Sequence, residues 1–334
     1  MKIAIIGAGT WATALSQVLV DNGRDVLMYS VHENQVNEIN NLHTNSKYFG
    51  HEVMLNPNIK ASLSLEDCLN GALYILLAVP TIAIRSVLEK IIPLIKEPKV
   101  FINAAKGFDP ETNKRITDVI RDVVPSSLLK GVVSIIGPGH AEEVIVRKLT
   151  CITSTSVNED DALACASLFA NDYFKVYTNT DEVGAEYGVA IKNAIAIASG
   201  ILDGLGYGDN ARAALVTRGL HEILRFGQYY GGDASTYMGL TGLGDLMVTC
   251  NSIHSRNFRA GVQIGKDDSA EFFLKHNEET TEGIRTARVV YELAKNKKIY
   301  MPIIDSVYRV LYEGAKPSVL VKELMMKPLK GEAE

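Results

Sequence analysis

The apolar segment GVAIKNAIAIASG, residues 188–200, carries one charged residue, Lys192, in a stretch long enough to form a helix. A helix that is apolar on nearly every side is normally buried, and burial disfavours an ammonium group and lowers its pKa. A lysine tuned in this way can donate and accept protons in catalysis. The alternative is that Lys192 extends along its own methylene stem to the surface, and this segment alone does not decide between the two.

A second group of candidate residues lies in GLTGLGDLMVTCNSIHSRNFRAG, residues 239–261. Asp245 stands between two apolar stretches and could hold a catalytic lysine or a substrate hydroxyl; its alternative role is to cap a helix. Ser255, Arg256 and Asn257 together suit a phosphate or a carboxylate, because a guanidinium presents a fork of N–H donors. An ordinary surface charge is the alternative for Arg256.

Lys106 follows the apolar stretch KVFINAA, residues 99–105, which has the composition of a buried strand. In an open α/β sheet, ligands bind outside the carboxyl ends of the strands. Lys106 could therefore meet the nicotinamide end of a cofactor or an anionic substrate, and an ordinary surface lysine is the alternative. Gly137 to Ala141 follow another such stretch, as a loop whose amides could face a ligand.

The N-terminal run IAIIGAGTWATAL places Gly7 and Gly9 directly after a strand pattern and before a helix pattern. This is the context of a dinucleotide-binding turn. The first glycine makes the tight turn, and the second lets the backbone approach a pyrophosphate at the helix N-terminus. Ala12, at the third glycine position, is small enough for close packing of the helix on the sheet. A glycine-rich turn without a ligand is the alternative.

The preference for NAD or NADP stays open. No carboxylate stands at Ser30, the end of the second predicted strand, where it would bind a ribose 2′-hydroxyl or repel a 2′-phosphate. Glu33 lies close enough to prevent a firm choice. His32 is explained as well by a surface turn as by a contact with the adenosine ribose.

Two kinds of structure are expected to position these residues. The first half of the chain alternates short, continuously apolar runs with helical patterns such as 10–22 and 82–96, which predicts a parallel, doubly wound sheet. The predicted strands are residues 2–6, 25–30, 73–79, 99–105, 132–136, 151–155 and 174–178. After about residue 180 the pattern is helical, and the predicted helices are residues 182–203, 210–230, 282–296 and 302–313. We therefore expect a Rossmann-like α/β dinucleotide-binding domain over residues 1–183 and an all-α substrate-binding domain over residues 184–334.

The composition of the 334-residue chain, 47% hydrophobic and 22% charged, fits a globular protein with a sizeable core and two domains. The net charge of -5 argues against nucleic acid as a partner, and no stretch approaches the roughly 18 apolar residues of a membrane span. Four scattered cysteines predict reduced thiols in a cytoplasmic protein. His140, His221 and His254 lack metal-ligand spacing, so we expect no metal.

With these motifs in place, the chain resembles the bacterial type of NAD(P)-dependent glycerol-3-phosphate dehydrogenase. The matching stretches are GAGTWATAL, AVPTIAIRSVL, AAKGF, GPGHAEEV, VAIKNAIAIASGILDGLGYGDNARAALVTRGL, GLTGLGDLMVTCNSIHSRNFRAG and EGIRTARVVYELA. They follow the family's order from residue 1 to about 313. The long stretch from Val189 to Leu220 and the block from GLTGLGDL to SRN are highly specific, whereas many dehydrogenases share the glycine-rich loop.

The resemblance implies a Rossmann-like domain and a helical domain with the active site between them. It implies reversible hydride transfer between NAD(P)H and dihydroxyacetone phosphate, which gives sn-glycerol 3-phosphate for phospholipid synthesis. A homodimer is implied on family grounds only. Reducing a ketone also requires a proton for the developing alkoxide, which a positioned ammonium can donate. Holding the phosphate fixes the carbonyl against the nicotinamide.

The resemblance also implies roles for individual residues. Lys192 matches the general acid/base, Lys106 the lysine that touches substrate and cofactor, and Asp245 the acid that organises the site. The phosphate-binding block is Ser255, Arg256 and Asn257, with Arg256 also reaching the cofactor. The other implied cofactor contacts are Gly7, Gly9, Thr10, Trp11, Ala12, His32, Ala141 and Glu282, and Gly137 is an implied substrate contact.

Three residues depart from the family pattern. Ala12 replaces the usual third glycine, and Val31 replaces a common histidine after the second strand, which further obscures the choice between NAD and NADP. Gly139 stands where the family has a hydroxyl residue, so a hydroxyl contact to the substrate is missing there and an altered substrate affinity is expected.

Two other functions are weighed against this one. A dehydrogenase of the β-hydroxyacid type would act on a carboxylate, and competition by phosphate esters would then be weak. A cofactor-sensing protein would bind the cofactor without turnover, which leaves the joint presence of Lys192, Lys106 and Asp245 unexplained.

Overall fold

The computed structural model describes residues 1–277, 279–329 and 331. By compactness the chain separates into two units. The first comprises Met1–Val189 with Gly231–Asp245, and the second comprises Ala190–Tyr230 with Leu246–Glu334. The domains predicted from the sequence, 1–183 and 184–334, assume a single crossing, whereas the chain passes between these units after Val189, after Tyr230 and after Asp245.

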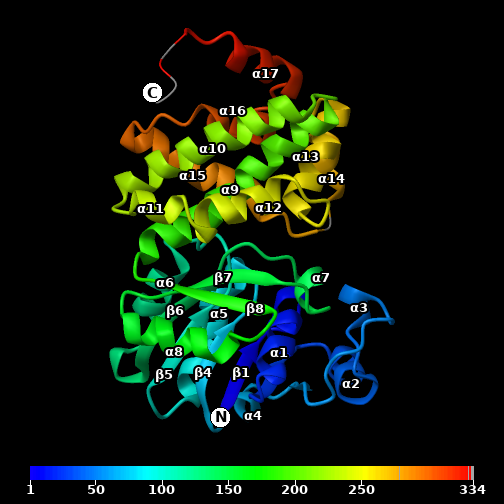
Figure 1. Ribbon diagram of the computed structural model, residues 1–334, viewed down its shortest axis with the longest axis vertical. Coiled ribbons are helices and arrows are strands. Elements are labelled where there is room, and N and C mark those ends of the chain that lie inside the picture. The colour runs from blue at the N-terminus through cyan, green and yellow to red at the C-terminus, as the bar shows by residue number, and fades with distance from the viewer. Residues whose placement is uncertain (278, 330, 332–334) are drawn as a thin grey trace. The chain divides into compact units, whose positions relative to one another are not determined.

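The first unit is built on an eight-stranded sheet with the order β3-β2-β1-β4-β5-β6-β7-β8 (Figure 1). The strands are β1 (Lys2–Ile6), β2 (Asp25–Tyr29), β3 (Lys60–Ser62), β4 (Ala72–Leu77), β5 (Lys99–Asn103), β6 (Leu129–Ile136), β7 (Thr150–Thr155) and β8 (Phe174–Asn179). All the strands predicted from apolar runs are present. The edge strand β3 was not predicted, because its three residues, KAS, contain no apolar run.

The sheet is parallel from β3 to β6, but β6 and β7 pair antiparallel, with Ser134 opposite Thr155. The expectation of a wholly parallel sheet is therefore wrong at this pair. The connection between the two strands holds only the four-residue helix α7 (Ala141–Val144), and a parallel crossover normally carries a full helix. β8 pairs parallel with β7.

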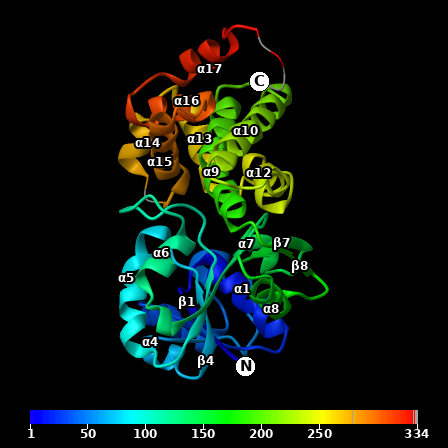
Figure 2. The ribbon, with the colours of Figure 1, turned by 90° about the vertical axis from the view of Figure 1, so that its left-hand side faces the viewer.

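Helices cover both faces of the sheet, as a doubly wound fold requires. Ile3 and Ile5 of β1 pack in one core cluster with residues of α1 (Thr10–Asp21) and α8 (Glu159–Phe169). Ala4 and Ile6 pack in the other with residues of α5 (Thr81–Ile91) and α6 (Ile116–Val123). Figure 2 shows these two helix layers on opposite sides of the strands. Because successive side chains of a strand point to opposite faces, a strand buried in this way reads as a continuous apolar run.

The second unit is helical, and its described residues contain no strand. Helix α9 (Glu182–Gly204) begins in the first unit and continues into the second. The other main helices of the second unit are α10 (Asp209–Tyr229), α13 (Arg256–Asp267), α15 (Glu282–Lys297), α16 (Pro302–Tyr312) and α17 (Pro317–Met325). The four helices predicted in this half of the chain are confirmed. Among the described residues, no helix is both long and apolar enough to cross a membrane.

Glycines bring α9 and α13 unusually close together. A Cβ atom on Gly200 would overlap the carbonyl oxygen of Phe258, and one on Gly261 would overlap that of Ile197. Gly204 and Gly265 repeat this pattern one turn further along. Backbone-to-backbone contact of this kind fixes α9, which carries Lys192, against α13, which begins with Arg256.

Candidate active site

The turn between β1 and α1 has the backbone that a bound dinucleotide requires. Gly7 has a φ of +118°, and a Cβ atom there would lie 2.6 Å from the carbonyl oxygen of Ala78, so only glycine fits. Gly9 lies just before Thr10, and a Cβ on Gly9 would meet nothing within 4 Å. No side chain caps this end of α1, and its first turn has no acidic residue. Its backbone N–H groups are therefore directed at a place where an anion would be stabilised.

The residues that follow Thr10 pack as the spacing predicts. Ala12 is fully buried in the core cluster of α1, which is the close packing expected at the third glycine position. Trp11 is half-buried, and a Cβ on Gly139 would lie 3.2 Å from its Cη2 atom. A serine or threonine at residue 139 would thus press on the indole ring, which gives a physical reason for glycine at this position.

His32 and Gly137 lie at the ends of two further strands. His32 is exposed, and it immediately precedes helix α2 (Glu33–Leu42). The end of β2 is tied to the glycine turn, since Gly7 N–H donates to the carbonyl oxygen of Tyr29 at 3.0 Å. Gly137 has a φ of +144° and directly follows β6, and Ala141 is buried as the first residue of α7.

Lys106, Gly137 and Asp245 are brought together within the first unit. The Lys106 ammonium donates to the carbonyl oxygen of Gly137 at 2.7 Å and lies 3.0 and 3.2 Å from the carboxylate oxygens of Asp245. Asp245 is fully buried, and the Lys106 side chain is 16% exposed. A buried carboxylate is stable only with a partner, so the pair holds the ammonium in one place. Asp245 does hold a lysine, and Lys106 is not an ordinary surface lysine.

Lys192 is buried in the second unit, so its side chain does not extend to the surface. It is 4% exposed, and its ammonium donates to the Thr249 hydroxyl at 2.6 Å. Thr249 lies on helix α12 (Asp245–Cys250), and the sequence reasoning did not single it out. Its position four residues after Asp245, one helical turn away, was a signal that could have done so.

Ser255 and Arg256 form the start of α13. The Ser255 hydroxyl accepts from the backbone N–H of Phe258 at 3.2 Å and thereby caps the helix. Arg256 is the first residue of α13 and is exposed. A guanidinium at a helix N-terminus adds a positive charge to the positive end of the helix dipole, which is a favourable place for a phosphate.

Asn257 is buried and joins three helices of the second unit. Its Nδ2 donates to Oδ1 of Asn193 on α9 at 3.0 Å, and its own Oδ1 accepts from the backbone N–H of Gly283 on α15 at 2.8 Å. Gly283 follows Glu282, the first residue of α15 and a predicted cofactor contact. Asn257 therefore fixes the start of α13 beside Asn193, the neighbour of Lys192.

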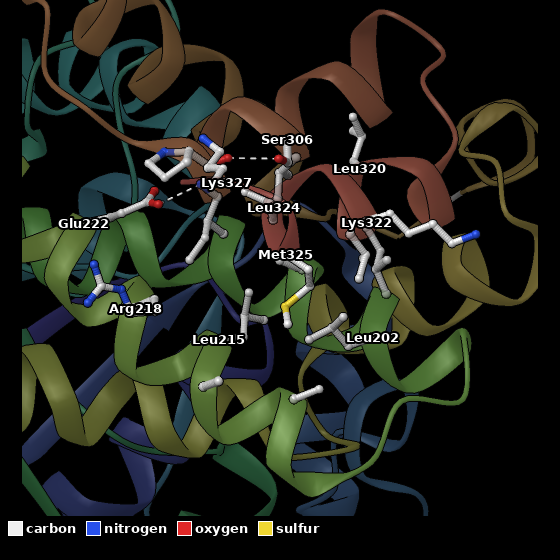
Figure 3. Close-up of a pocket in the computed structure, with 18 of the residues that line it drawn as sticks. Leu202, Leu215, Arg218, Glu222, Ser306, Leu320, Lys322, Leu324, Met325 and Lys327 are labelled. Atoms are coloured by element: carbon white, nitrogen blue, oxygen red, sulfur yellow. Dashed lines mark hydrogen bonds between the residues drawn. The ribbon is translucent and has the colours of Figure 1, made fainter. Parts of the chain in front are cut away.

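A cavity of about 800 Å³ in the second unit contains none of the predicted site residues. Its walls come mainly from α9, α10, α16 and α17 and are largely apolar, as Leu202, Leu215, Leu324 and Met325 illustrate in Figure 3. Such a lining does not suit a small phosphorylated substrate, which needs several polar partners. The candidate catalytic residues, not this cavity, define the site.

These features define a class of protein, a dinucleotide-binding dehydrogenase with a doubly wound sheet and a helical unit that carries the buried lysine. Comparison with known proteins is more specific. The family model described as NAD-dependent glycerol-3-phosphate dehydrogenase N-terminus matches residues 2–162, and the model for the C-terminus of the same family matches residues 181–322. The chain belongs to the NAD-dependent glycerol-3-phosphate dehydrogenase family, which confirms the resemblance inferred from its motifs.

Individual relatives cover the whole chain. A glycerol-3-phosphate dehydrogenase [NAD(P)+] of Bacillus cereus is 47% identical over 100% of this chain and 98% of its own length. The enzyme of the same name from Bacillus velezensis is 45% identical over 100% of this chain and 96% of its own length. The crystal structure of glycerol-3-phosphate dehydrogenase from Coxiella burnetii is 33% identical, with a TM-score of 0.90 over 98% of this chain and 99% of that one.

Proposed function

We propose that this chain catalyses the reversible, NAD(P)H-dependent reduction of dihydroxyacetone phosphate to sn-glycerol 3-phosphate, which supplies glycerophospholipid synthesis. The observation that carries the proposal is Lys192, an ammonium buried in an apolar helix and held by Thr249, in a member of this dehydrogenase family. Burying an ammonium costs free energy, which hydrogen-bond partners offset only in part. Proton transfer in catalysis is a function that accounts for a lysine kept at such a position.

The glycine turn fits the proposed cofactor. The N-terminus of α1, with Gly9 before it and no acidic side chain in its first turn, would hold the pyrophosphate. NAD(P)H supplies the hydride when it is bound. Further proposed contacts come from Thr10, Trp11, Ala12, His32, Ala141 and Glu282. The preference between NAD and NADP is left to experiment.

Lys192 is proposed to be the general acid and base of the reaction. In the direction of reduction its ammonium donates a proton to the carbonyl oxygen of the substrate and stabilises the negative charge that develops there. In the direction of oxidation the neutral amine removes the hydroxyl proton. The hydrogen bond to Thr249, 2.6 Å long, holds the nitrogen in a fixed position for both directions.

Lys106 is proposed to contact both substrate and cofactor, and Asp245 to hold it there. The ion pair of 3.0 Å with Asp245 holds the ammonium in place, and the bond to the carbonyl of Gly137 sets its direction. A charge fixed before the substrate arrives needs no reorganisation during the reaction, which is the usual source of electrostatic catalysis.

The phosphate of the substrate is proposed to bind at the start of α13. Arg256 offers its guanidinium fork, and Ser255 and Asn257 flank it. Since the phosphate is remote from the carbonyl, its binding energy fixes the reacting carbon relative to the hydride donor and lowers the entropic part of the barrier.

Initial rates with dihydroxyacetone phosphate and either NADH or NADPH test the substrate and the cofactor together. We expect turnover with at least one cofactor, and competition by glycerol 3-phosphate that is much stronger than competition by β-hydroxyacids. Turnover of hydroxyacids alone would favour the β-hydroxyacid type of dehydrogenase. Cofactor binding without any turnover would favour the cofactor-sensing protein.

A homodimer is proposed on family grounds. Light scattering coupled to size-exclusion chromatography measures the mass directly, and a mass of one chain at micromolar concentration would reject the dimer. A cytoplasmic location is proposed because the four cysteines, Cys68, Cys151, Cys165 and Cys250, are scattered along the chain without a C-x-x-C pair, a pattern that favours reduced thiols. Nucleic acid is not expected as a partner, given the net charge of -5.

A further inference from the structure

A buried carboxylate on α9, that of Glu186, joins three elements of the first unit. Its Oε1 accepts from Nδ2 of Asn103 on β5 at 3.2 Å and from the hydroxyl of Ser134 on β6 at 3.3 Å. Its Oε2 accepts from the hydroxyl of Thr117 on α6 at 2.6 Å and from Arg115 at 3.4 Å. Glu186 is 6% exposed, so these four donors replace the water that a surface carboxylate would have.

Asn103 connects this carboxylate to the backbone that leads into Lys106. It is the last residue of β5 and is fully buried. Its Oδ1 accepts from the backbone N–H of Ala105 at 2.9 Å, and its Nδ2 lies 3.2 Å from the Ala105 carbonyl oxygen. Rotating the amide by half a turn would place its oxygen against the Glu186 carboxylate, which is repulsive. Glu186 therefore fixes the orientation of Asn103, and Asn103 fixes the residue before Lys106.

Ser134 makes the corresponding connection on the neighbouring strand. It lies on β6, three residues before Gly137, whose carbonyl oxygen accepts from the Lys106 ammonium. One carboxylate thus holds both strand ends that define the place of this ammonium. β5 delivers the lysine, and β6 delivers its acceptor.

We propose that Glu186 is a positioning residue for the proposed reaction: its carboxylate fixes the ends of β5 and β6, and thereby keeps the Lys106 ammonium bonded to Asp245 and Gly137. The inference rests on the proposed function, in which Lys106 contacts substrate and cofactor. Glu186 acts through Asn103 and Ser134.

The charge on Glu186 is open to titration near neutral pH. Burial raises the pKa of its carboxyl from 4.5 to about 7. The charged groups that face it are Arg115, which lowers the pKa, and Glu182 and Asp118, which raise it, with Arg121 paired to Glu182. The carboxylate accepts all four hydrogen bonds above this pKa, whereas protonation turns one oxygen into a donor. The network is therefore complete at pH 8 and weakened at pH 6.

The test uses Glu186→Gln in the full chain, with Glu182→Gln as the matched control. Glutamine keeps the size of the side chain, but its NH2 group must face either the Nδ2 of Asn103 or the guanidinium of Arg115, and neither of these groups can accept a hydrogen bond. We expect kcat/KM for dihydroxyacetone phosphate to fall by about tenfold at pH 8, the scale of one buried donor left unpaired. We expect kcat/KM of the wild type to fall below pH 7, and we expect this fall to be absent in Glu186→Gln.

Glu182 separates positioning from folding. It lies one turn earlier on α9, is 2% exposed and is held by Arg121, but it does not bond Asn103 or Ser134. Glu182→Gln should lower Tm and leave kcat/KM at pH 8 as in the wild type. Because Glu182 raises the pKa of Glu186, its removal should move the fall of kcat/KM to lower pH without abolishing it. In the double variant Glu186→Gln, Asn103→Ser, the loss in kcat/KM should not exceed the larger single loss, because the two residues act in series.

Three results would overturn the proposal. The first is a Glu186→Gln enzyme with a lower Tm but the kcat/KM and pH profile of the wild type. The second is a double variant in which the two single losses of kcat/KM add fully. The third is a Glu182→Gln control that loses as much kcat/KM as Glu186→Gln. A wild type that binds NADH without reducing dihydroxyacetone phosphate would instead refute the proposed function. In that case, NADH dissociation constants from fluorescence titration test whether Glu186 positions Lys106. Weaker NADH binding by Glu186→Gln than by Glu182→Gln supports this role, and equal binding by the two variants rejects it.

Discussion

Glu222, on α10 of the second unit, should make the stability of this protein fall as the pH rises. The residue is 2% exposed, and burial raises its pKa from 4.5 to about 8. The backbone N–H groups of Ile303 and Ile304, at 2.7 and 3.1 Å, lower the pKa but do not offset burial. Because the folded pKa lies above the unfolded one, the stabilisation is fully present below pH 4.5 and is lost as the pH rises through about 8.

The magnitude follows from the two pKa values. Between them the folded state holds one more proton than the unfolded state, so Glu222 lowers the free energy of unfolding by about 1.4 kcal/mol per pH unit. From pH 6 to pH 8 this amounts to about 2 kcal/mol, because the folded-state carboxyl is already half ionised at pH 8, and this is a substantial part of the stability of a typical domain. The residue is only 2% exposed, so solvent screening reduces the effect little.

Unfolding in urea, followed by far-ultraviolet circular dichroism at pH 6 and pH 8, measures this slope. Hydrogen exchange at Ile303 and Ile304 reports the same change locally at the start of α16. Glu222→Gln should remove about 2 kcal/mol of the pH dependence between pH 6 and pH 8, since the amide does not titrate. Glu323→Gln is the matched control, because Glu323 is exposed, pairs with Arg309 at 2.8 Å and has a lowered pKa. A Glu222→Gln protein with the wild-type slope would refute the reasoning.

Three further predictions concern the proposed active site and the helix packing that supports it. Lys192→Ala should retain NADH binding in a fluorescence titration while initial rates fall by at least about a hundredfold, and near-wild-type turnover would reject its catalytic role. Arg256→Ala should raise the KM for dihydroxyacetone phosphate by at least about tenfold, and an unchanged KM in steady-state kinetics would remove its phosphate role. Gly261→Ala should destabilise the protein by about 1–3 kcal/mol, measured as a fall in Tm, because the new Cβ would overlap the Ile197 carbonyl. Gly208→Ala, whose Cβ would meet nothing within 4 Å, should lower Tm much less, since it changes only the N-cap residue of α10.

The sequence predicted the strands and helices whose apolar residue pattern follows directly from which of their faces are buried. The central strands are apolar on both faces because helices cover both faces, and a run such as KIAII can hardly be anything else. Strand β3 has no such run, and it exists because Leu27–Tyr29 of β2 offer it a parallel partner. The direction of β7 likewise depends on the length of a connecting helix, which apolar patterning does not report.

The geometry of the candidate site was predictable where the backbone conformation itself restricts the residue type. Gly7 needs a positive φ and the absence of a Cβ, and both requirements are visible as a glycine at a fixed place between strand and helix. The burial of Lys192 was not predictable in the same way. An apolar helix is compatible with a lysine that reaches the surface, and only the position of Thr249 beside its nitrogen settles where the ammonium lies.

The buried carboxylates of α9 show why positioning residues are harder to predict than catalytic ones. Glu182 and Glu186 stand four residues apart at the start of a helix, a pattern that is typical of a solvated face. Their partners, Arg121 and Arg115, lie 61 and 71 residues earlier in the chain, on and just before α6. A lysine in an apolar helix is conspicuous because its own neighbours make it costly, whereas a glutamate becomes part of a site only when the fold brings distant donors to it. Positioning glutamates must therefore be found from the hydrogen bonds of the folded chain. Of these two, Glu186 is the one whose bonds lead through Asn103 to the backbone just before Lys106.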